Sequence, residues 1–285
     1  MANLRFNEDY QNYFDPKIYL GHLYENLRGD ENDYPSTVLV IKAYHEFWST
    51  FKAPKGTDVR YLEFGGGPCI ANLVFACPKV DHIVFAEYVE ANRQAVKSWI
   101  AGDPDAFDWM PLIEIAVLEL EQGRGIAESP AVPRTDKEKL DCVNRASELK
   151  GKIKSVVPCD VFKAPIVQLD SDDVAKPFDV VSSIFCLSAC VSSEVHYRKT
   201  VAELCKLLKP NGYLFTLGFI GQTFYCVGEE KFSTFPLTEK MVKEAMNEAG
   251  MQILKFVSTP VLYSTEYFDG KAIYCTHCRK SGARE

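Results

Sequence analysis

A short apolar run followed by three consecutive glycines constrains the fold of this chain more than any other feature. Tyr61–Phe64 has the length and apolar character of a buried strand, and Gly65, Gly66 and Gly67 come directly after it. The apolar residues after Pro68 begin a helix. Glycines at a strand-to-helix turn permit positive φ angles and let a ligand approach the bare backbone. The sequence therefore predicts a ligand site at the carboxyl end of this strand.

An acidic residue lies at the end of each of the first three predicted strands: Glu63, Glu87 and Asp160. Glu87 follows Gly67 by about 20 residues, the interval at which nucleotide-binding folds place a carboxylate on ribose hydroxyls. Any one of these carboxylates could instead cap the helix that follows it. Three in succession at one sheet edge favour a ligand rich in hydrogen-bond donors, such as adenosine.

Beyond the glycine loop, predicted strands and helices alternate to the end of the chain. This alternation implies an α/β fold, a doubly wound and mostly parallel seven-stranded sheet. The strands are expected at residues 58–64, 82–87, 153–158, 178–185, 213–217, 253–258 and 272–278, and the helices at residues 69–77, 91–100, 136–149, 195–208 and 238–249.

Three other segments lack this alternation. Residues 101–135 are predicted to form a loose surface connection, and residues 209–212 a turn. Residues 1–50 are aromatic and helical in character. They either pack their rings onto the core or form a lid whose tyrosines close over a ligand, because a phenol offers apolar area and a hydrogen bond together.

Composition excludes several classes of partner. A net charge of −7 argues against a nucleic-acid partner, which needs a basic face, and no apolar run has the length of a membrane span. Ten irregularly spaced cysteines, and a beginning without a signal-peptide core, favour reduced thiols and a cytoplasmic location. No metal is expected, because the pair Cys275 and Cys278 has no second pair nearby. A monomer acting on a small molecule is the simplest expectation.

The segment Leu207–Leu214 distinguishes between two candidate cofactors, S-adenosylmethionine and NAD. A helix that ends in Leu-Lys-Pro-x-Gly before an apolar strand is familiar in S-adenosylmethionine-dependent methyltransferases, and dehydrogenases usually lack it. An NAD-dependent oxidoreductase would also need a hydride-transfer group that the sequence does not reveal. The cofactor expected from this segment is therefore S-adenosyl-L-methionine, with S-adenosyl-L-homocysteine as its product.

Further segments, colinear and spread over nearly the whole chain, carry a closer resemblance. They are residues 12–20, 65–68, 107–109, 159–161, 185–187 and 227–232. The chain in these segments resembles the nicotinamide, phenylethanolamine and indolethylamine N-methyltransferase family. The resemblance implies one Rossmann-like methyltransferase domain over residues 1–285, with a helical lid at 1–50, a core at 51–285 and an acceptor-side hairpin near 219–233. It also implies methyl transfer to the nitrogen of a small amine or N-heterocycle by in-line attack.

The same resemblance implies which residues surround the ligands. Those implied at the cofactor are Tyr10, Tyr19 and Tyr24 from the lid; Glu63, Gly65, Gly66 and Gly67 at the methionyl part; Glu87, Tyr88 and Asn92 at the ribose and adenine side; Asp160 and Val161 at the adenine; and Ile184 and Phe185 along the fourth strand. Tyr225 and Tyr19 are implied beside the acceptor.

The chain departs from the family at two acceptor-side positions where relatives carry an acid. These positions hold Ser188 and Gly218. One hypothesis is that Asp269 or Glu266, in the loop before the last strand, takes over amine recognition; the alternative is that both are solvated loop charges. Loss of both acids also leaves open a second function, a cofactor-binding family member with lost or altered catalysis.

Overall fold

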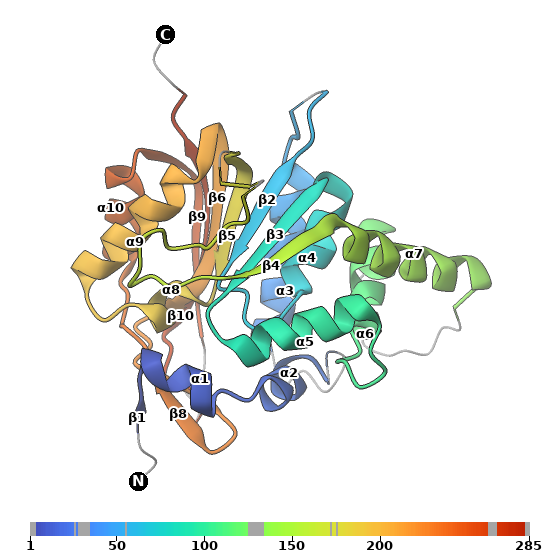
Figure 1. The fold of residues 1–285 in the computed structure, drawn as a ribbon, viewed down its shortest axis with the longest axis horizontal. Helices are drawn as coiled ribbons and strands as arrows, with labels where there is room; N and C mark the ends of the chain where they lie inside the picture. Colours follow the sequence, from blue (N-terminus) through green and yellow to red (C-terminus); the bar gives the residue numbers. More distant parts are fainter. Residues whose placement is uncertain are drawn as a thin grey trace.

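The computed structural model describes residues 4–25, 27, 35–54, 56–124, 134–171, 173–174, 176–261 and 267–282. Its centre is a seven-stranded sheet in the order β4-β3-β2-β5-β6-β10-β9 (Figure 1). The strands are β2 (Arg60–Phe64), β3 (His82–Glu87), β4 (Ile153–Pro158), β5 (Phe178–Ile184), β6 (Leu208–Ile220), β9 (Met251–Pro260) and β10 (Ala272–Lys280). The five strands from β4 to β6 are parallel, whereas β10 runs antiparallel to both β6 and β9. The predicted doubly wound, mostly parallel sheet is confirmed.

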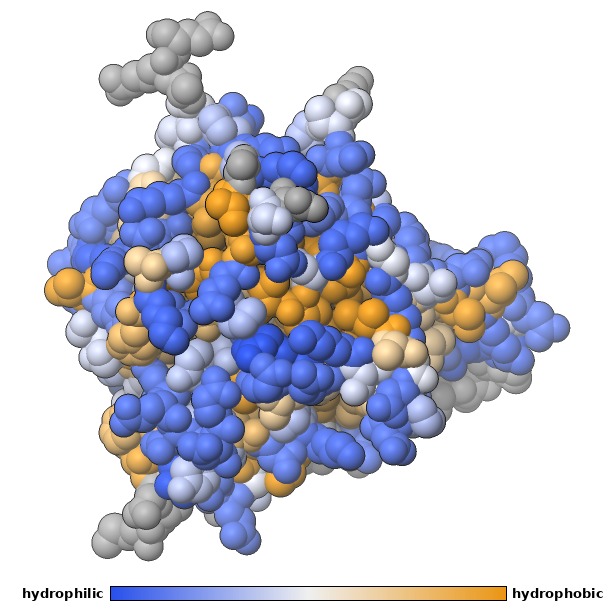
Figure 2. Space-filling model, viewed as in Figure 1, coloured by the Kyte–Doolittle hydropathy of each residue, from blue (hydrophilic) through white to orange (hydrophobic). Residues whose placement is uncertain are grey.

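Helices cover both faces of this sheet. One face packs against α3 (Pro35–Thr50), α4 (Ala71–Ala76), α5 (Glu90–Ala101) and α7 (Asp136–Lys152), and the other against α9 (Glu194–Lys206) and α10 (Glu239–Glu248). Successive side chains of a strand point to opposite faces, so Tyr61 packs on the first side and Leu62 on the second. Figure 2 shows hydrophilic side chains over most of one face of the molecule, with hydrophobic ones gathered over the middle of the view.

Several helices begin at residues whose side chains satisfy free backbone N–H groups. Asp15 accepts from Lys17 and Ile18, and Thr135 forms a reciprocal capping box with Glu138. Ser193 and Thr238 cap α9 and α10 in the same way. Within the described part of the chain, no helix combines the length and apolarity that a membrane crossing requires.

A second, three-stranded sheet lies at the carboxyl end of the large one. It contains β1 (Leu4–Arg5), β8 (Glu230–Ser233) and β7 (Phe224–Val227), with β1 parallel to β8. The N-terminal helices α1 (Tyr10–Tyr13) and α2 (Pro16–Tyr24) lie beside this sheet, at the lower edge of the view in Figure 1.

Two local predictions are wrong. Residues 110–121 are not a loose surface connection, because α6 (Met110–Glu114) continues into a π-helix (Ile115–Glu121) whose apolar residues are buried in the core. Residues 209–212 are not a separate turn but lie within β6. β6 has more residues between Leu208 and Tyr213 than β5 has between their partners, Phe178 and Val180. A register shift between the two strands accommodates them, and Asn211 adopts a φ of 64°.

Candidate cofactor and acceptor site

A cavity lies at the carboxyl ends of β2 to β5, between these strand ends, the N-terminal helices and the β7–β8 hairpin. Parallel strands bring their carboxyl ends to one edge, where ligands of such sheets bind. Most residues implied at the cofactor line this cavity: Tyr10, Tyr19, Gly65, Gly66, Gly67, Glu87, Tyr88, Asn92, Asp160, Val161, Ile184 and Phe185. Tyr225, implied beside the acceptor, lines it as well.

The glycine loop after β2 needs glycine for two different reasons. Gly65 and Gly67 have φ angles of 67° and 62°, a region that other residues rarely adopt. A Cβ on Gly65 would also lie 2.1 Å from the Sγ of Cys186, whereas a Cβ on Gly67 would meet no atom within 4 Å. Gly65 thus permits close packing against Cys186, and Gly67 leaves its side of the loop open.

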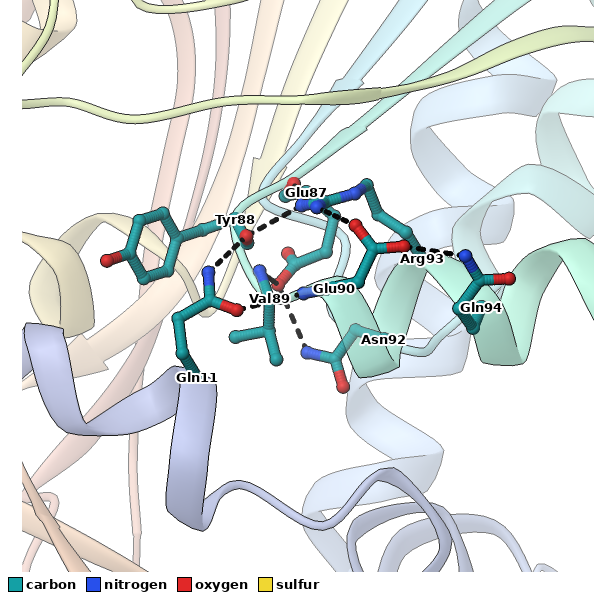
Figure 3. Close-up of polar contacts among 8 residues, drawn as sticks. All are labelled: Gln11, Glu87, Tyr88, Val89, Glu90, Asn92, Arg93 and Gln94. Carbon is teal, nitrogen blue, oxygen red and sulfur yellow. Dashed lines mark hydrogen bonds and ion pairs between the residues drawn. The ribbon is translucent and has the colours of Figure 1, made fainter.

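Glu87, at the end of β3, is held by three donors, and Figure 3 draws two of them, Val89 and Asn92. Its Oε1 accepts from the backbone N–H of Val89 at 2.8 Å and from the Nδ2 of Asn92 at 3.1 Å. Its Oε2 accepts from the backbone N–H of Gly67 at 2.9 Å. Burial raises the pKa of Glu87, and these hydrogen bonds oppose the rise. The carboxylate therefore has a fixed orientation and ties the glycine loop to α5.

Asn92 offers a buried acceptor that no protein group uses. The side chain is 2% exposed, its Nδ2 donates to Glu87, and its Oδ1 has no hydrogen-bond partner. Because leaving a buried acceptor unpaired is costly, an unpaired oxygen in a cavity wall indicates a donor on the ligand. Ribose hydroxyls meet this requirement, so Asn92 and Glu87 fit the nucleoside part of S-adenosylmethionine.

The opposite part of the wall is aromatic. The hydroxyl of Tyr225, on β7, donates to that of Tyr10, on α1, at 2.9 Å, and the Tyr10 ring lies 4.5 Å from that of Phe232. The Tyr19 and Phe14 rings lie 5.1 Å apart. Burial raises the pKa of Tyr10, Tyr19 and Tyr225, so all three phenols are neutral. This part of the site offers apolar area and hydroxyl groups rather than charge.

The N-terminal segment closes the cavity from both sides. Gln11 donates to the carbonyl of Tyr88 at 2.7 Å and accepts from the backbone N–H of Glu90 at 3.2 Å (Figure 3). On the other side, Leu4 and Arg5 pair with β8. The helices α1 and α2 contribute Tyr10 and Tyr19 to the cavity lining, whereas α3 buries its aromatic rings in the core.

Two residues implied at the cofactor lie outside the cavity lining. Tyr24 is buried against the ring of Trp109 at 5.0 Å, and its hydroxyl accepts a hydrogen bond from Cys69. Glu63 points away from the cavity wall, into a buried cluster of Tyr61, Asn72 and Ser182.

The residues proposed for the acceptor other than Tyr19 and Tyr225 are also placed elsewhere. Ser188 is buried in α8 (Leu187–Cys190), and a Cβ on Gly218 would lie 3.0 Å from the ring of Tyr274. Neither lines the cavity. An acidic side chain at position 218 would require Tyr274 to move. Glu266 lies outside the described residues.

Asp269 holds the hairpin that carries Tyr225. Its Oδ1 accepts from the backbone N–H groups of Thr223 at 2.7 Å and Phe224 at 3.1 Å, and its Oδ2 accepts from the Thr223 hydroxyl. Partial burial acts to raise the pKa of Asp269, but the hydrogen bonds from Thr223 and Phe224 outweigh it, and the pKa is lowered. Asp269 does not line the cavity. These contacts favour a structural role over direct amine recognition.

Several wall residues were not singled out from the sequence as site residues. They are Asn7, Phe14, Phe64, Val89, Cys159, Phe162, Cys186, Ala189 and Cys190. Most are chain neighbours of expected residues, which is the signal that could have found them.

Comparison with known proteins gives the family. The NNMT/PNMT/TEMT family model matches residues 3–281. Nicotinamide N-methyltransferase of Homo sapiens is 29% identical over 277 residues, which cover 96% of this chain and 95% of that protein. Indolethylamine N-methyltransferase of Mus musculus is 30% identical over 260 residues, which cover 91% of this chain and 90% of that protein.

Solved structures agree on the fold. Magnesium protoporphyrin IX methyltransferase of Synechocystis PCC 6803, solved with bound S-adenosylhomocysteine, has a TM-score of 0.54 at 11% identity, covering 96% of this chain and 97% of that chain. The same enzyme with bound S-adenosylmethionine gives a TM-score of 0.53. The matched residues of the family model span the lid, the glycine loop and the hairpin that together form the cavity. The chain belongs to the NNMT/PNMT/TEMT family and is an enzyme of the S-adenosylmethionine-dependent methyltransferase class.

Proposed function

We propose that this enzyme transfers a methyl group to a nitrogen atom of a small amine or N-heterocycle. The observation that carries the proposal is a single cavity with two unlike walls. One wall has Glu87 and the unpaired acceptor of Asn92, and the other has the phenols of Tyr10 and Tyr225. A nucleoside cofactor and a small aromatic or aliphatic acceptor suit these two walls. The names of the relatives, which are N-methyltransferases, support nitrogen as the acceptor atom.

The chemistry asks little of the protein beyond binding and orientation. When bound, S-adenosylmethionine supplies a methyl group that is activated on a sulfonium. Glu87 and Asn92 would hold ribose hydroxyls, because they present oriented acceptors at the end of β3 and the start of α5. Tyr10, Tyr19 and Tyr225 would orient the acceptor and exclude water from it.

The proton state of the acceptor matters as well. An aliphatic amine must lose a proton before its lone pair can react, whereas a pyridine-type nitrogen needs no such step. The phenols around the acceptor wall are neutral and can accept a hydrogen bond from an amine N–H. A heterocycle therefore needs no proton acceptor among the residues of this wall, whereas an aliphatic amine does.

The test begins with calorimetric titration of the purified protein with S-adenosylhomocysteine, and with NAD as the control ligand. Micromolar binding of the first ligand alone is expected. Methyl transfer is then measured by mass spectrometry with panels of amines, pyridines and indoles. Turnover of a nitrogen compound would support the proposal. Tight cofactor binding without turnover of any panel member would refute it in favour of a family member with lost or altered catalysis.

A further inference from the structure

A buried carboxylate lies directly beneath the glycine loop. Glu63 is 3% exposed, and a Cβ built on Gly66 would lie 3.1 Å from its Cγ. Gly66 lines the cavity, so the Glu63 side chain packs directly behind a residue of the cavity wall. Among the residues that the structure describes, no lysine, arginine or histidine forms an ion pair with Glu63. A buried anion is costly unless it is paired or hydrogen-bonded.

Three neutral groups donate hydrogen bonds to this carboxylate. The Oε2 of Glu63 accepts from the Nδ2 of Asn72 at 2.9 Å and from the Oγ of Ser182 at 2.5 Å. It also accepts from the hydroxyl of Tyr61. All three donors are buried, and they come from α4, β5 and β2. Three separate elements of the fold therefore converge on one oxygen.

A fourth residue fixes the direction of the Asn72 amide. The indole Nε1 of Trp48 donates to the Oδ1 of Asn72 at 2.8 Å. Because an indole N–H can only donate, the amide oxygen faces Trp48 and the amide N–H₂ group faces Glu63 and the Tyr61 oxygen, the latter at 2.8 Å. We call Trp48, Tyr61, Asn72 and Ser182 the Glu63 network.

The hydrogens of the Glu63 network fit an ionised carboxylate. Tyr61 and Ser182 have one hydroxyl hydrogen each, and the Asn72 amide has two. The Tyr61 and Ser182 hydroxyls also lie 2.6 Å apart, so one of them can donate to the other instead of to Glu63, and none of these hydrogen bonds requires a proton on Glu63. Donors that converge on one oxygen favour the ionised form, because a carboxylate accepts only and its hydrogen bonds are stronger than those of a neutral carboxyl.

The surroundings of Glu63 add no compensating charge. Burial raises the pKa of Glu63, and the hydrogen bonds from Ser182, Tyr61 and Asn72 oppose this rise. The other titratable groups affected by its charge are Tyr44, on α3, and Cys69, after the glycine loop, and burial raises their pKa values too. These groups are neutral at pH 7, so within the described part of the chain an ionised Glu63 has no cationic partner.

We propose that the Glu63 network consists of positioning residues that keep Glu63 anionic and so bias the site toward a sulfonium ligand over its neutral thioether. The inference rests on the proposed function only through its cofactor. S-adenosylmethionine carries a sulfonium charge that S-adenosylhomocysteine lacks, whereas the two share the same ammonium and carboxylate groups. An uncompensated anion beneath the loop stabilises the sulfonium form selectively, because attraction between charges is strong where water is excluded. Loss of that charge on methyl transfer then favours release of the product.

The experiment compares dissociation constants of three ligands by calorimetry on the full chain. The ligands are S-adenosylmethionine, the thioether S-adenosylhomocysteine, and sinefungin, in which an amine replaces the sulfonium. Ser182→Ala and Tyr61→Phe each remove one donor, and each should weaken binding of the two cationic ligands about tenfold. Binding of the thioether should change less than about threefold. Glu63→Gln should give the largest loss of selectivity.

Ser183→Ala is the matched control. Ser183 is the next residue of β5 and is equally buried, but its hydroxyl has no hydrogen-bond partner. This variant should bind all three ligands as the wild type does. Ser182→Thr, which keeps the hydroxyl, should retain the selectivity that Ser182→Ala loses.

Two results would overturn the inference. A parallel loss of affinity for all three ligands in Ser182→Ala and Tyr61→Phe would show that the network is only structural. Unchanged dissociation constants in both variants would show that it does not act on the ligand at all. If Glu63→Gln fails to fold, the two single-hydroxyl variants decide the question. A wild type that methylates no acceptor, yet loses selectivity in these variants, would refute the proposed function alone.

Discussion

Replacing Gly65 or Gly67 by alanine should separate two effects that the glycine loop combines. Both residues have positive φ, so either substitution costs about 1–2 kcal/mol of backbone strain. At Gly65 the new Cβ would also meet the Sγ and Cβ of Cys186 at 2.1 and 2.7 Å. Rotation of the Cys186 side chain moves its Sγ but not its Cβ. The clash with the Cβ of Cys186 therefore remains, and α8 or the loop must shift. Overpacking of this kind costs about 1–3 kcal/mol more.

Gly65→Ala should therefore lower the free energy of unfolding by about 2–5 kcal/mol, and Gly67→Ala by about 1–2 kcal/mol. Urea unfolding monitored by tryptophan fluorescence measures both values. Gly67→Ala also bears on ligand binding, because its methyl group stands in open space beside the cavity. We expect Gly67→Ala to weaken S-adenosylhomocysteine binding about tenfold while it retains most of the stability. Equal destabilisation by the two substitutions would refute the reasoning about Cys186.

Three further predictions concern single side chains. Asn92→Leu should weaken S-adenosylhomocysteine binding about tenfold, since its unpaired oxygen is lost, and calorimetry would contradict this by showing wild-type affinity. Asp269→Asn and Thr223→Val should each raise the KM for an acceptor without changing cofactor affinity, because both loosen the hairpin. If Asp269 instead contacts an amine directly, only Asp269→Asn will affect turnover. Wild-type rates after alanine replacement of both Asp269 and Glu266 would exclude amine recognition by either residue. Burial lowers the pKa of His277 in the folded chain to about 4. As pH falls through about 6.5, this histidine therefore binds a proton in the unfolded chain but not in the folded one. The free energy of unfolding decreases between about pH 6.5 and pH 4 as a result. His277→Phe should therefore reduce the loss of unfolding free energy between pH 7 and pH 5 by about 2 kcal/mol, measured by urea unfolding at both values.

The features that the sequence predicted are those with a local signal. The apolar run before Gly65, the acidic strand ends and the alternation of strands with helices are all short-range patterns, and each matches an element of the sheet. The acids at Glu87 and Asp160 reach the cavity because parallel strands end at the same edge.

The features that the sequence did not reveal depend on contacts between distant segments. The pairing of Leu4 with Lys231 joins residues more than 200 positions apart, and a two-residue strand has no periodicity to detect. The direction of Glu63, beneath the loop rather than into the cavity, follows from Asn72 and Ser182 on other elements. The helical character of residues 110–121 was missed because their hydrophobic residues are nearly continuous, and a continuous run has no amphipathic period.

The short pairing between β1 and β8 has a consequence for how quickly ligands exchange. The N-terminal segment is held by two paired residues, the Arg5–Glu230 ion pair, hydrogen bonds of Asn7, Gln11 and Tyr10, and ring contacts with Phe232. These contacts are few beside those of the seven-stranded sheet, so the segment can detach while the core stays folded. We expect the backbone amides of Leu4 and Arg5 to exchange with deuterium much faster than those of β2 and β5, and to slow when S-adenosylhomocysteine is bound. Opening of the N-terminal segment, rather than the global stability of the fold, would then set the residence time of the product.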